Sequence, residues 1–328
     1  MNRGDSAVLL RIQNLKKHYA VRGGILTGQQ GLVRALDGVS LEVYRGETLG
    51  LVGESGCGKT TLGRMIVRID EPTEGTLAFE NDDVLALSKA SLKDYHRKVQ
   101  LVFQDPYSSL NPRRTAASII GEPLRIHGFD GAEGIVEKVA ALMQVVGLNR
   151  EQMGRYPHEF SGGQRQRIGI ARAIALKPKL IIADEPVSAL DVSIQAQILN
   201  LLRELQGQFG LTYIFISHDL SVVRHMSDRV AVMYLGKIVE LAGSDNLYEN
   251  PLHPYTQALL SAIPVPDPSV RKKRMILNGD VPSPLDPPAG CAFHPRCPFR
   301  FDPCDRVEPP LERRGPNRFA ACHLPVGA

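Results

Sequence analysis

Eight consecutive residues near the start of the chain have the types and spacing of a phosphate-binding loop. The run reads Gly53-Glu54-Ser55-Gly56-Cys57-Gly58-Lys59-Thr60 and is followed by Thr61. Glycines let successive backbone N–H groups point at anionic oxygens, a lysine reaches the β- and γ-phosphates, and a hydroxyl group binds Mg²⁺. A strand is predicted just before the loop and a helix just after it, and a helix N-terminus favours phosphate. We therefore expect these nine residues to bind a nucleotide, with Cys57 as a small residue that does no chemistry of its own.

Two carboxylates follow an apolar run later in the chain. Leu180–Ala183 has the length of a buried strand, and Asp184 and Glu185 come directly after it. Because carboxylate oxygens suit Mg²⁺, Asp184 is a candidate magnesium ligand, through water. Glu185 is the candidate base that polarises an attacking water, a role typically worth about 10²–10⁴-fold in rate. The alternative is a solvated acidic pair before Pro186.

A serine–glycine turn lies between these two motifs. It reads Ser161-Gly162-Gly163-Gln164 and has the pattern of a helix start. The exposed N–H groups in the first turn of such a helix attract anions. We therefore expect a second anion site, far in sequence from the phosphate loop.

Length and composition limit the class of protein. A chain of 328 residues has a soft prior of about two domains, and 43% apolar residues suffice for a sizeable core. The net charge of +4 is too small to indicate nucleic-acid binding by itself. No apolar run approaches the roughly 18 residues that span a bilayer, and no signal peptide is expected. We expect the chain to stay in the cytosol and to reach a membrane only by docking.

Strand and helix patterns alternate up to about residue 250. Besides the run before Asp184, strands are predicted at Leu9–Ile12, Val39–Val43, Thr48–Val52, Val99–Phe103, Tyr213–Ile216 and Val230–Tyr234. Helices are predicted at Lys59–Ile69, Val192–Leu205 and Tyr255–Ile263. This alternation favours an α/β fold with a largely parallel sheet covered on both faces. Between Ala116 and Met153 the apolar spacing is helical, which predicts a helical subdomain over about residues 105–165.

The composition changes after Pro251. Sixteen of the 23 prolines lie from there onward, so regular structure should be sparse. Four of the five cysteines also lie in this part: Cys291, Cys297, Cys304 and Cys322. In a reducing compartment such a group of cysteines indicates a metal or cluster site. The bound group would stabilise a C-terminal segment that cannot easily build a hydrophobic core of its own. Its spacing is not the usual zinc spacing, and four thiolates are the ligand set of a [4Fe–4S] cluster. Zinc, with His294 or His323 as a substitute ligand, and free thiols remain alternatives.

Taken together, the motifs resemble those of the ATP-binding subunits of ABC transporters, over roughly Val8 to Gly243. The turn at Ser161 resembles the ABC signature, with Phe160 where leucine is usual. Gln104 matches the Q-loop glutamine, His218 the switch histidine, and Tyr19 the aromatic residue that stacks on adenine. The run Ser188-Ala189-Leu190-Asp191 matches the D-loop.

The resemblance implies a fold and a set of roles. The fold would be a phosphate-loop ATPase cassette, mostly parallel, with antiparallel N-terminal strands and a helical signature subdomain. Thr60, Gln104 and Asp184 would act at Mg²⁺, His218 would contact the γ-phosphate, and Glu185 would be the base. The signature would face the ATP of a second subunit, so that two ATP molecules join two cassettes.

Two further stretches resemble the dipeptide and oligopeptide importer subfamily. One is the Q-loop region from Val102 to Arg113, and the other is the tail, including Asn250-Pro251-Leu252-His253-Pro254-Tyr255-Thr256 and the segment from Gly290 to Pro298. The likeness is greatest to the second ATPase of a dipeptide importer. It implies a cassette over residues 1–250, an extension over 251–328 that holds a [4Fe–4S] cluster, and import of di- or oligopeptides. Nickel, glutathione and other small solutes are alternative cargoes.

The same likeness implies partners and a location. They are a related second ATPase, two membrane permease subunits and, indirectly, an extracytoplasmic solute-binding protein. The chain would lie at the cytoplasmic face of the inner membrane. A soluble ABC ATPase that acts on nucleic acid or the ribosome is the competing class. We do not expect it, because the chain has a single cassette and no long heptad segment between phosphate loop and signature.

Overall fold

A computed structural model of the chain describes residues 7–22, 30–105, 107, 109–129, 132–264 and 274–325. The described residues form two compact units, each built from several segments of the chain. The phosphate-loop unit lies within Val8–Val43, Thr48–Leu85 and Ser217–Ala328. The helical unit contains Ala7, Tyr44–Glu47 and Ala86–Ile216. Pro106 and Ser108 of the Q-loop region lie outside the described residues.

An antiparallel sheet forms the first layer of the phosphate-loop unit. Its strand order is β2-β1-β4-β5, and Leu10 and Ile12 of β1 pair with Phe79 and Leu77 of β4. These four side chains are buried, so the alternating apolar residues of the two strands form one face of a core. The strands are β1 (Val8–Arg22), β2 (Gln30–Tyr44), β4 (Glu74–Phe79) and β5 (Asp82–Asp83).

A second group of strands in this unit has the order β11-β12-β10-β9-β3. Strands β3 and β9 are parallel, whereas β9, β10, β12 and β11 pair antiparallel. The strands are β3 (Thr48–Val52), β9 (Arg229–Tyr234), β10 (Lys237–Gly243), β11 (Glu312–Gly315) and β12 (Arg318–Ala320). The helices are α1 (Lys59–Ile66), α7 (Leu220–Met226), α8 (Ser244–Glu249), α9 (Pro254–Ser261) and the 3₁₀ turn η3 (His294–Arg296).

Three parallel strands in the order β8-β7-β6 form the sheet of the helical unit. Strands β7 and β8 are completely buried, as their continuous apolar runs predict. The strands are β6 (Val99–Val102), β7 (Leu180–Asp184) and β8 (Thr212–Ile216). The helices are α2 (Lys89–Lys98), α3 (Ala116–Ile126), α4 (Ala132–Val145), α5 (Gly162–Ile174) and α6 (Val192–Phe209), with 3₁₀ turns η1 (Arg150–Gly154) and η2 (Pro157–Glu159).

The observed elements agree with the predicted parallel strands, antiparallel N-terminal strands and helical insertion. Among the described residues between Ala116 and Met153 there is no strand, as expected. The tail is mostly irregular apart from α9, which lies where a helix was predicted over Tyr255–Ile263. It also contains the short pair β11–β12, which composition did not predict. Searched over the described residues, the helices include none that is both long and apolar enough to cross a bilayer.

Candidate functional site: a nucleotide-binding cassette

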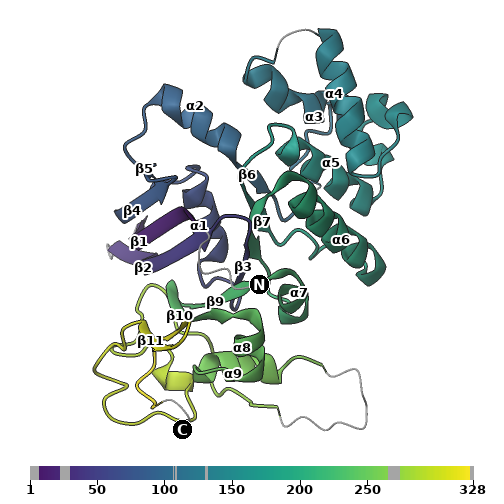
Figure 1. Cartoon of the computed structure of the whole chain (residues 1–328). Helices are drawn as coiled ribbons and strands as arrows, with labels where there is room; N and C mark the ends of the chain where they lie inside the picture. The colour runs from purple at the N-terminus through teal and green to yellow at the C-terminus, as the bar shows by residue number, and fades with distance from the viewer. Residues whose placement is uncertain are drawn as a thin grey trace. The chain divides into compact units, whose positions relative to one another are not determined.

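The phosphate loop connects the buried strand β3 with helix α1, as the sequence predicted (Figure 1). Helix α1 begins at Lys59, directly after the loop. The Lys59 ammonium group is buried and donates hydrogen bonds to the carbonyl oxygens of Gly53, at 2.7 Å, and Glu54, at 3.0 Å. The ammonium group therefore lies against the backbone of the phosphate loop, where it is expected to contact a bound phosphate.

Two glycines fix the shape of this loop. Gly53 has φ +155°, and a Cβ atom there would lie 2.2 Å from the carbonyl oxygen of Met233. Gly58 has φ +107°, and a Cβ atom there would lie 2.4 Å from the carbonyl oxygen of Ala35. Both neighbours are backbone atoms and both φ values disfavour other residues, so only glycine fits at either position.

Cys57 has a structural role in the loop. Its side chain is buried, and its carbonyl oxygen accepts a hydrogen bond from the Gly236 N–H at 2.9 Å. Burial raises the pKa of the Cys57 thiol more than the neighbouring Lys59 lowers it. A protonated thiol is a poor nucleophile, which agrees with the expectation that this cysteine does no chemistry.

His218 belongs to the same unit as the phosphate loop. It is exposed in the turn before α7, and the preceding residue, Ser217, donates its N–H to the carbonyl oxygen of Leu51 in β3 at 3.2 Å. That bond fixes the turn beside the last residues of β3, the strand that leads into the loop.

Tyr19 lies on β1 of the same unit. Its side chain is 39% exposed, its hydroxyl donates to an Asp70 oxygen at 3.5 Å, and the Lys17 ammonium group lies 4.9 Å from the ring centroid. An exposed aromatic ring on a strand can stack on a base.

The helical unit brings Gln104 and Glu185 together. Gln104 follows β6, and its side-chain amide donates a hydrogen bond of 2.8 Å to the Glu185 carboxylate. Asp184 is the last, buried residue of β7. Glu185 has φ +45°, a conformation that is unfavourable for a residue other than glycine, and its N–H donates to the Ile216 carbonyl oxygen at 2.9 Å. Such strain often occurs where a side chain must point in one functional direction.

The expected D-loop is hydrogen-bonded to the backbone of Glu185. Ser188 donates its hydroxyl to the carbonyl oxygen of Glu185 at 3.1 Å, and Asp191 is the N-cap residue of α6. The Gln195 side chain donates to the carbonyl oxygens of Val187 and Leu190, at 3.1 and 2.9 Å. Sequence reasoning did not single out Gln195, because a glutamine in the first turn of a helix is common.

The signature turn is the N-terminus of α5. Ser161 and Gln164 form a capping box: the serine hydroxyl accepts the Gln164 N–H at 3.3 Å, and the glutamine oxygen accepts the Ser161 N–H at 3.0 Å. A Cβ atom on Gly163 would lie 2.5 Å from the Ile194 side chain, so α5 and α6 approach closely there. The cap leaves the serine at the start of a 13-residue helix, where anions are favoured.

The four tail cysteines line one small cavity, together with His294 and His323. All four are free thiols. Over the described part of the chain, however, no group of three or more His, Cys, Asp or Glu side chains is arranged to hold a metal ion. The structure therefore gives no support to the predicted zinc or iron–sulfur site beyond this convergence of thiols.

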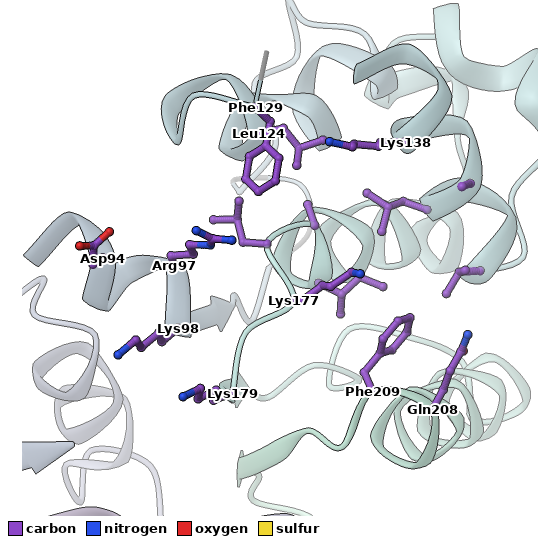
Figure 2. A pocket seen from close by; sticks show the side chains of 16 residues that line it. Asp94, Arg97, Lys98, Leu124, Phe129, Lys138, Lys177, Lys179, Gln208 and Phe209 are labelled. Atoms are coloured by element: carbon purple, nitrogen blue, oxygen red, sulfur yellow. The ribbon is translucent and has the colours of Figure 1, made fainter. Parts of the chain in front are cut away.

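A cavity of about 950 Å³ lies elsewhere in the helical unit (Figure 2). Its lining includes Lys98 and Lys179, which directly precede β6 and β7, and Phe209 at the end of α6. It therefore lies at the amino ends of these parallel strands, whereas Gln104 and Glu185 follow the carboxyl ends. None of the predicted site residues lines it.

Comparisons with known proteins agree with this geometry. Residues 36–188 match a family described as "ABC transporter", and residues 239–304 match "Oligopeptide/dipeptide transporter, C-terminal region". An oligopeptide transport ATP-binding protein of Bacillus subtilis, AppF, is 55% identical, and the alignment covers 99% of each chain. A probable peptide ABC transporter ATP-binding protein of Sinorhizobium fredii, y4tS, is 53% identical over 97% of this chain and 90% of that protein.

A solved structure has the same fold. The ATP-binding cassette MJ0796, in a post-hydrolysis state bound to ADP and phosphate, has a TM-score of 0.64 and 30% identity over 72% of this chain and 99% of that chain. Alongside the phosphate loop between β3 and α1, the capped start of α5 and the Gln104–Glu185 hydrogen bond, these matches show that the chain belongs to the ATP-binding proteins of ABC transporters, in the oligopeptide and dipeptide group.

Proposed function

We propose that the chain is the ATP-hydrolysing subunit of an importer of di- and oligopeptides. The observation that carries this proposal is the 2.8 Å hydrogen bond between Gln104 and Glu185, on a chain that also has a formed phosphate loop. A nucleotide-binding protein that only binds has no need of a carboxylate held in this way. Membership of the peptide-transport group supplies the cargo class.

Each motif of the site has its own role in ATP hydrolysis. The loop from Gly53 to Thr61 holds the phosphates, and Lys59 neutralises their charge. The Thr60 hydroxyl and the buried Asp184 carboxylate are hard oxygen donors that suit Mg²⁺, which would supply Lewis-acid neutralisation of the phosphate oxygens. Glu185 accepts a proton from the attacking water, and Gln104 fixes the direction of its carboxylate.

The remaining motifs extend this assignment to a pair of subunits. Ser161 and the first turn of α5 bind the γ-phosphate held by a second ATPase. The D-loop is hydrogen-bonded to the Glu185 backbone through Ser188 and couples the conformations of the two ATP sites. His218 contacts the γ-phosphate, and the exposed ring of Tyr19 stacks on adenine. The capping box supports the first of these roles, because it keeps the serine and the helix N-terminus in a single conformation.

The tail suggests a second, structural component. We assign residues 1–250 to the cassette and 251–328 to a C-terminal extension whose four cysteines hold a [4Fe–4S] cluster. The support is the donor set: the four thiols line one cavity. Burial raises the pKa of Cys291 to about 11, so a thiolate there needs a nearby positive centre. Iron and sulfide in the anaerobically purified chain would support the cluster, and stoichiometric zinc would exclude it.

The proposed partners follow from the group. They are a related second ATPase, two membrane permease subunits at the cytoplasmic face of the membrane, and indirectly an extracytoplasmic solute-binding protein.

Uptake in cells tests the function. Cells that carry Glu185→Gln should lose uptake of labelled di- and oligopeptides but keep Ni²⁺ uptake, while the purified variant still binds ATP. Glu204→Gln, on the exposed face of α6, is the matched control and should transport normally. Normal peptide uptake with loss of Ni²⁺ uptake would overturn the cargo, and normal ATP hydrolysis by Glu185→Gln would overturn the assignment of the base. Lys59→Ala should instead weaken ATP binding itself.

A further inference from the structure

The phosphate loop is in contact with a residue far along the chain. Arg296, in the cysteine-bearing segment, donates two hydrogen bonds to the Glu54 carboxylate, from Nη1 to Oε2 at 2.7 Å and from Nη2 to Oε1 at 3.1 Å. The arginine side chain is only 8% exposed and the glutamate 30%. A bidentate, largely buried pair of this kind is among the stronger charge-assisted contacts in proteins. Sequence reasoning missed it, because 242 residues separate the partners.

A second residue of the extension holds the same loop residue. The Glu54 N–H donates to the hydroxyl oxygen of Tyr255 at 2.9 Å, and Tyr255 is completely buried in α9. Burial raises the pKa of this phenol, so the hydroxyl stays neutral and remains an acceptor for the N–H. The side chain and the backbone of Glu54 are thus both fixed by the extension.

An aromatic cluster makes this attachment rigid. The ring of Phe293 lies 5.3 Å from that of Tyr234, at the end of β9, and 5.4 Å from that of Tyr255. Phe293 is buried and comes three residues before Arg296, so packing of the ring sets the position of the guanidinium group. Aromatic pairs at these distances stabilise beyond their buried area.

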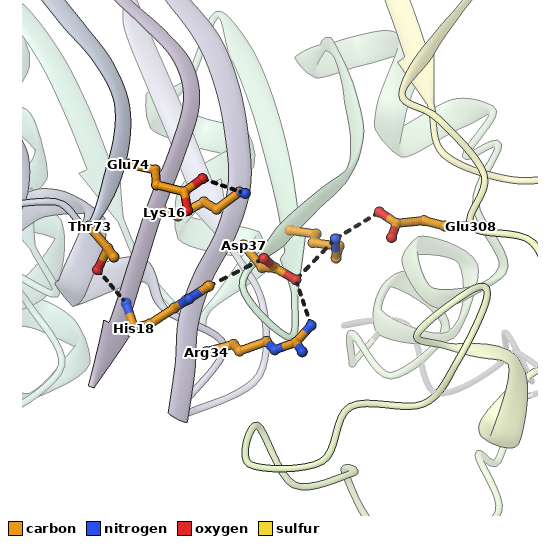
Figure 3. A network of polar contacts seen from close by, with 8 residues as sticks. Lys16, His18, Arg34, Asp37, Thr73, Glu74 and Glu308 are labelled. Carbon is orange, nitrogen blue, oxygen red and sulfur yellow. Dashed lines mark hydrogen bonds and ion pairs between the residues drawn. The ribbon is translucent and has the colours of Figure 1, made fainter. Parts of the chain in front are cut away.

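Ion pairs anchor the extension at a second place (Figure 3). The Lys237 ammonium group lies 2.7 Å from the Glu308 carboxylate of the extension and 3.4 Å from Asp37 of β2. Strand β12 of the extension also pairs with β10. Arg296 and Tyr255, which contact the phosphate loop, therefore belong to a segment that is itself anchored by these ion pairs and by the β10–β12 pairing.

The charge on Glu54 matters because the loop receives a polyanion. A carboxylate in a phosphate loop repels a nucleoside triphosphate unless it is neutralised, and the repulsion grows where water is partly excluded. Arg296 neutralises this carboxylate and holds it in one direction.

We infer that the C-terminal extension clamps the phosphate loop, with Arg296 as a positioning residue for ATP binding that acts through Glu54. This inference rests on the proposed function, since it assigns a control of affinity to the same nucleotide site. The contacts made by the extension would thus raise the affinity of the phosphate loop for ATP.

Binding of MgATP to the full chain, measured by titration calorimetry, tests the clamp. R296M should bind roughly tenfold or more weakly, because a charged hydrogen-bond partner is lost and a carboxylate is left unpaired. R296K, which keeps the charge but not the fork, should fall between R296M and wild type. R306M is the matched control: Arg306 lies in the same extension, is 66% exposed and pairs with Asp302, so wild-type affinity is expected.

A double variant separates positioning from folding. If Arg296 acts through Glu54, then R296M/E54Q should bind MgATP within about threefold of E54Q alone, because no unpaired carboxylate remains. A general loss of structure would not be repaired by E54Q. In ATPase assays R296M should raise KM for ATP and leave kcat nearly unchanged.

The outcomes are distinct. Wild-type affinity in R296M, or equal losses from R296M with and without E54Q, would overturn the clamp and leave the proposed function standing. A wild-type chain that does not bind MgATP would overturn both.

Discussion

The N-cap of α9 makes the stability of the extension sensitive to pH. His253 is completely buried, its Nδ1 accepts the Tyr255 N–H at 3.0 Å, and burial lowers the pKa of the imidazole from 6.5 to about 3. When α9 opens, the ring reaches water and recovers its ordinary pKa. The open state therefore binds a proton first, so stability is complete above pH 6.5 and is lost as the pH falls towards 3. Between pH 7.5 and 5.5 the loss is about 1.4 kcal/mol, or about tenfold in the opening constant.

Amide hydrogen exchange in α9 measures this opening directly, after correction for the pH dependence of the intrinsic rate. His253→Asn is the matched variant, because asparagine also caps helices but does not titrate. Glu240 accepts the His253 N–H at 2.8 Å, and burial raises the pKa of its carboxyl, an effect of opposite sign that is common to both chains. The same pH dependence in wild type and variant between pH 7.5 and 5.5, or a His253 that titrates near 6.5 in the folded chain, would refute the reasoning.

Three further predictions concern the motifs. Gly53→Ala should weaken MgATP binding more than Gly56→Ala. Both positions have a positive φ that strains alanine, but only the Cβ at Gly53 would also overlap a backbone oxygen, whereas a Cβ at Gly56 meets nothing within 4 Å; titration calorimetry compares the two. Gly163→Ala should lower the thermal midpoint because of its 2.5 Å contact, while Gly169→Ala, in open space within the same helix, should raise stability by about 0.5–1 kcal/mol. Ser161→Ala should cost about 1 kcal/mol in chemical denaturation, since it removes the capping box of α5.

The elements predicted well are those whose geometry is decided locally. Strand β3 was predicted at its observed bounds, and α6 begins at Val192 as expected. Helix α6 continues to Phe209 instead of ending at Leu205, because its stop signal is Gly210 in the left-handed conformation. The phosphate loop and the helix start at the signature turn were also predicted, since each depends on glycines and hydroxyl groups within a few residues.

The elements missed depend on partners that are distant in sequence. Strand β12 has only three residues, and it forms because Ala320 and Phe319 pair with Glu240 and Leu241 of β10. Strand β1 extends to Arg22, well past its apolar run, and β4 pairs with its polar residues as far as Lys16. No local pattern contains this information.

Many of the contacts that the sequence did not predict join residues of the proposed extension to residues of the proposed cassette. Glu240 holds the residues before α9, Tyr255 of α9 holds the Glu54 N–H, and Arg296 holds the Glu54 carboxylate. If these contacts form one support, then protonation of His253 on opening of α9 should also release the hold of Tyr255 on the loop. Exchange of the Glu54 amide hydrogen, which Tyr255 protects, should then become faster as the pH falls from 7.5 to 5.5 in the wild type, relative to the intrinsic rate, but not in His253→Asn. The same pH dependence in both chains would mean that the cap and the clamp are independent.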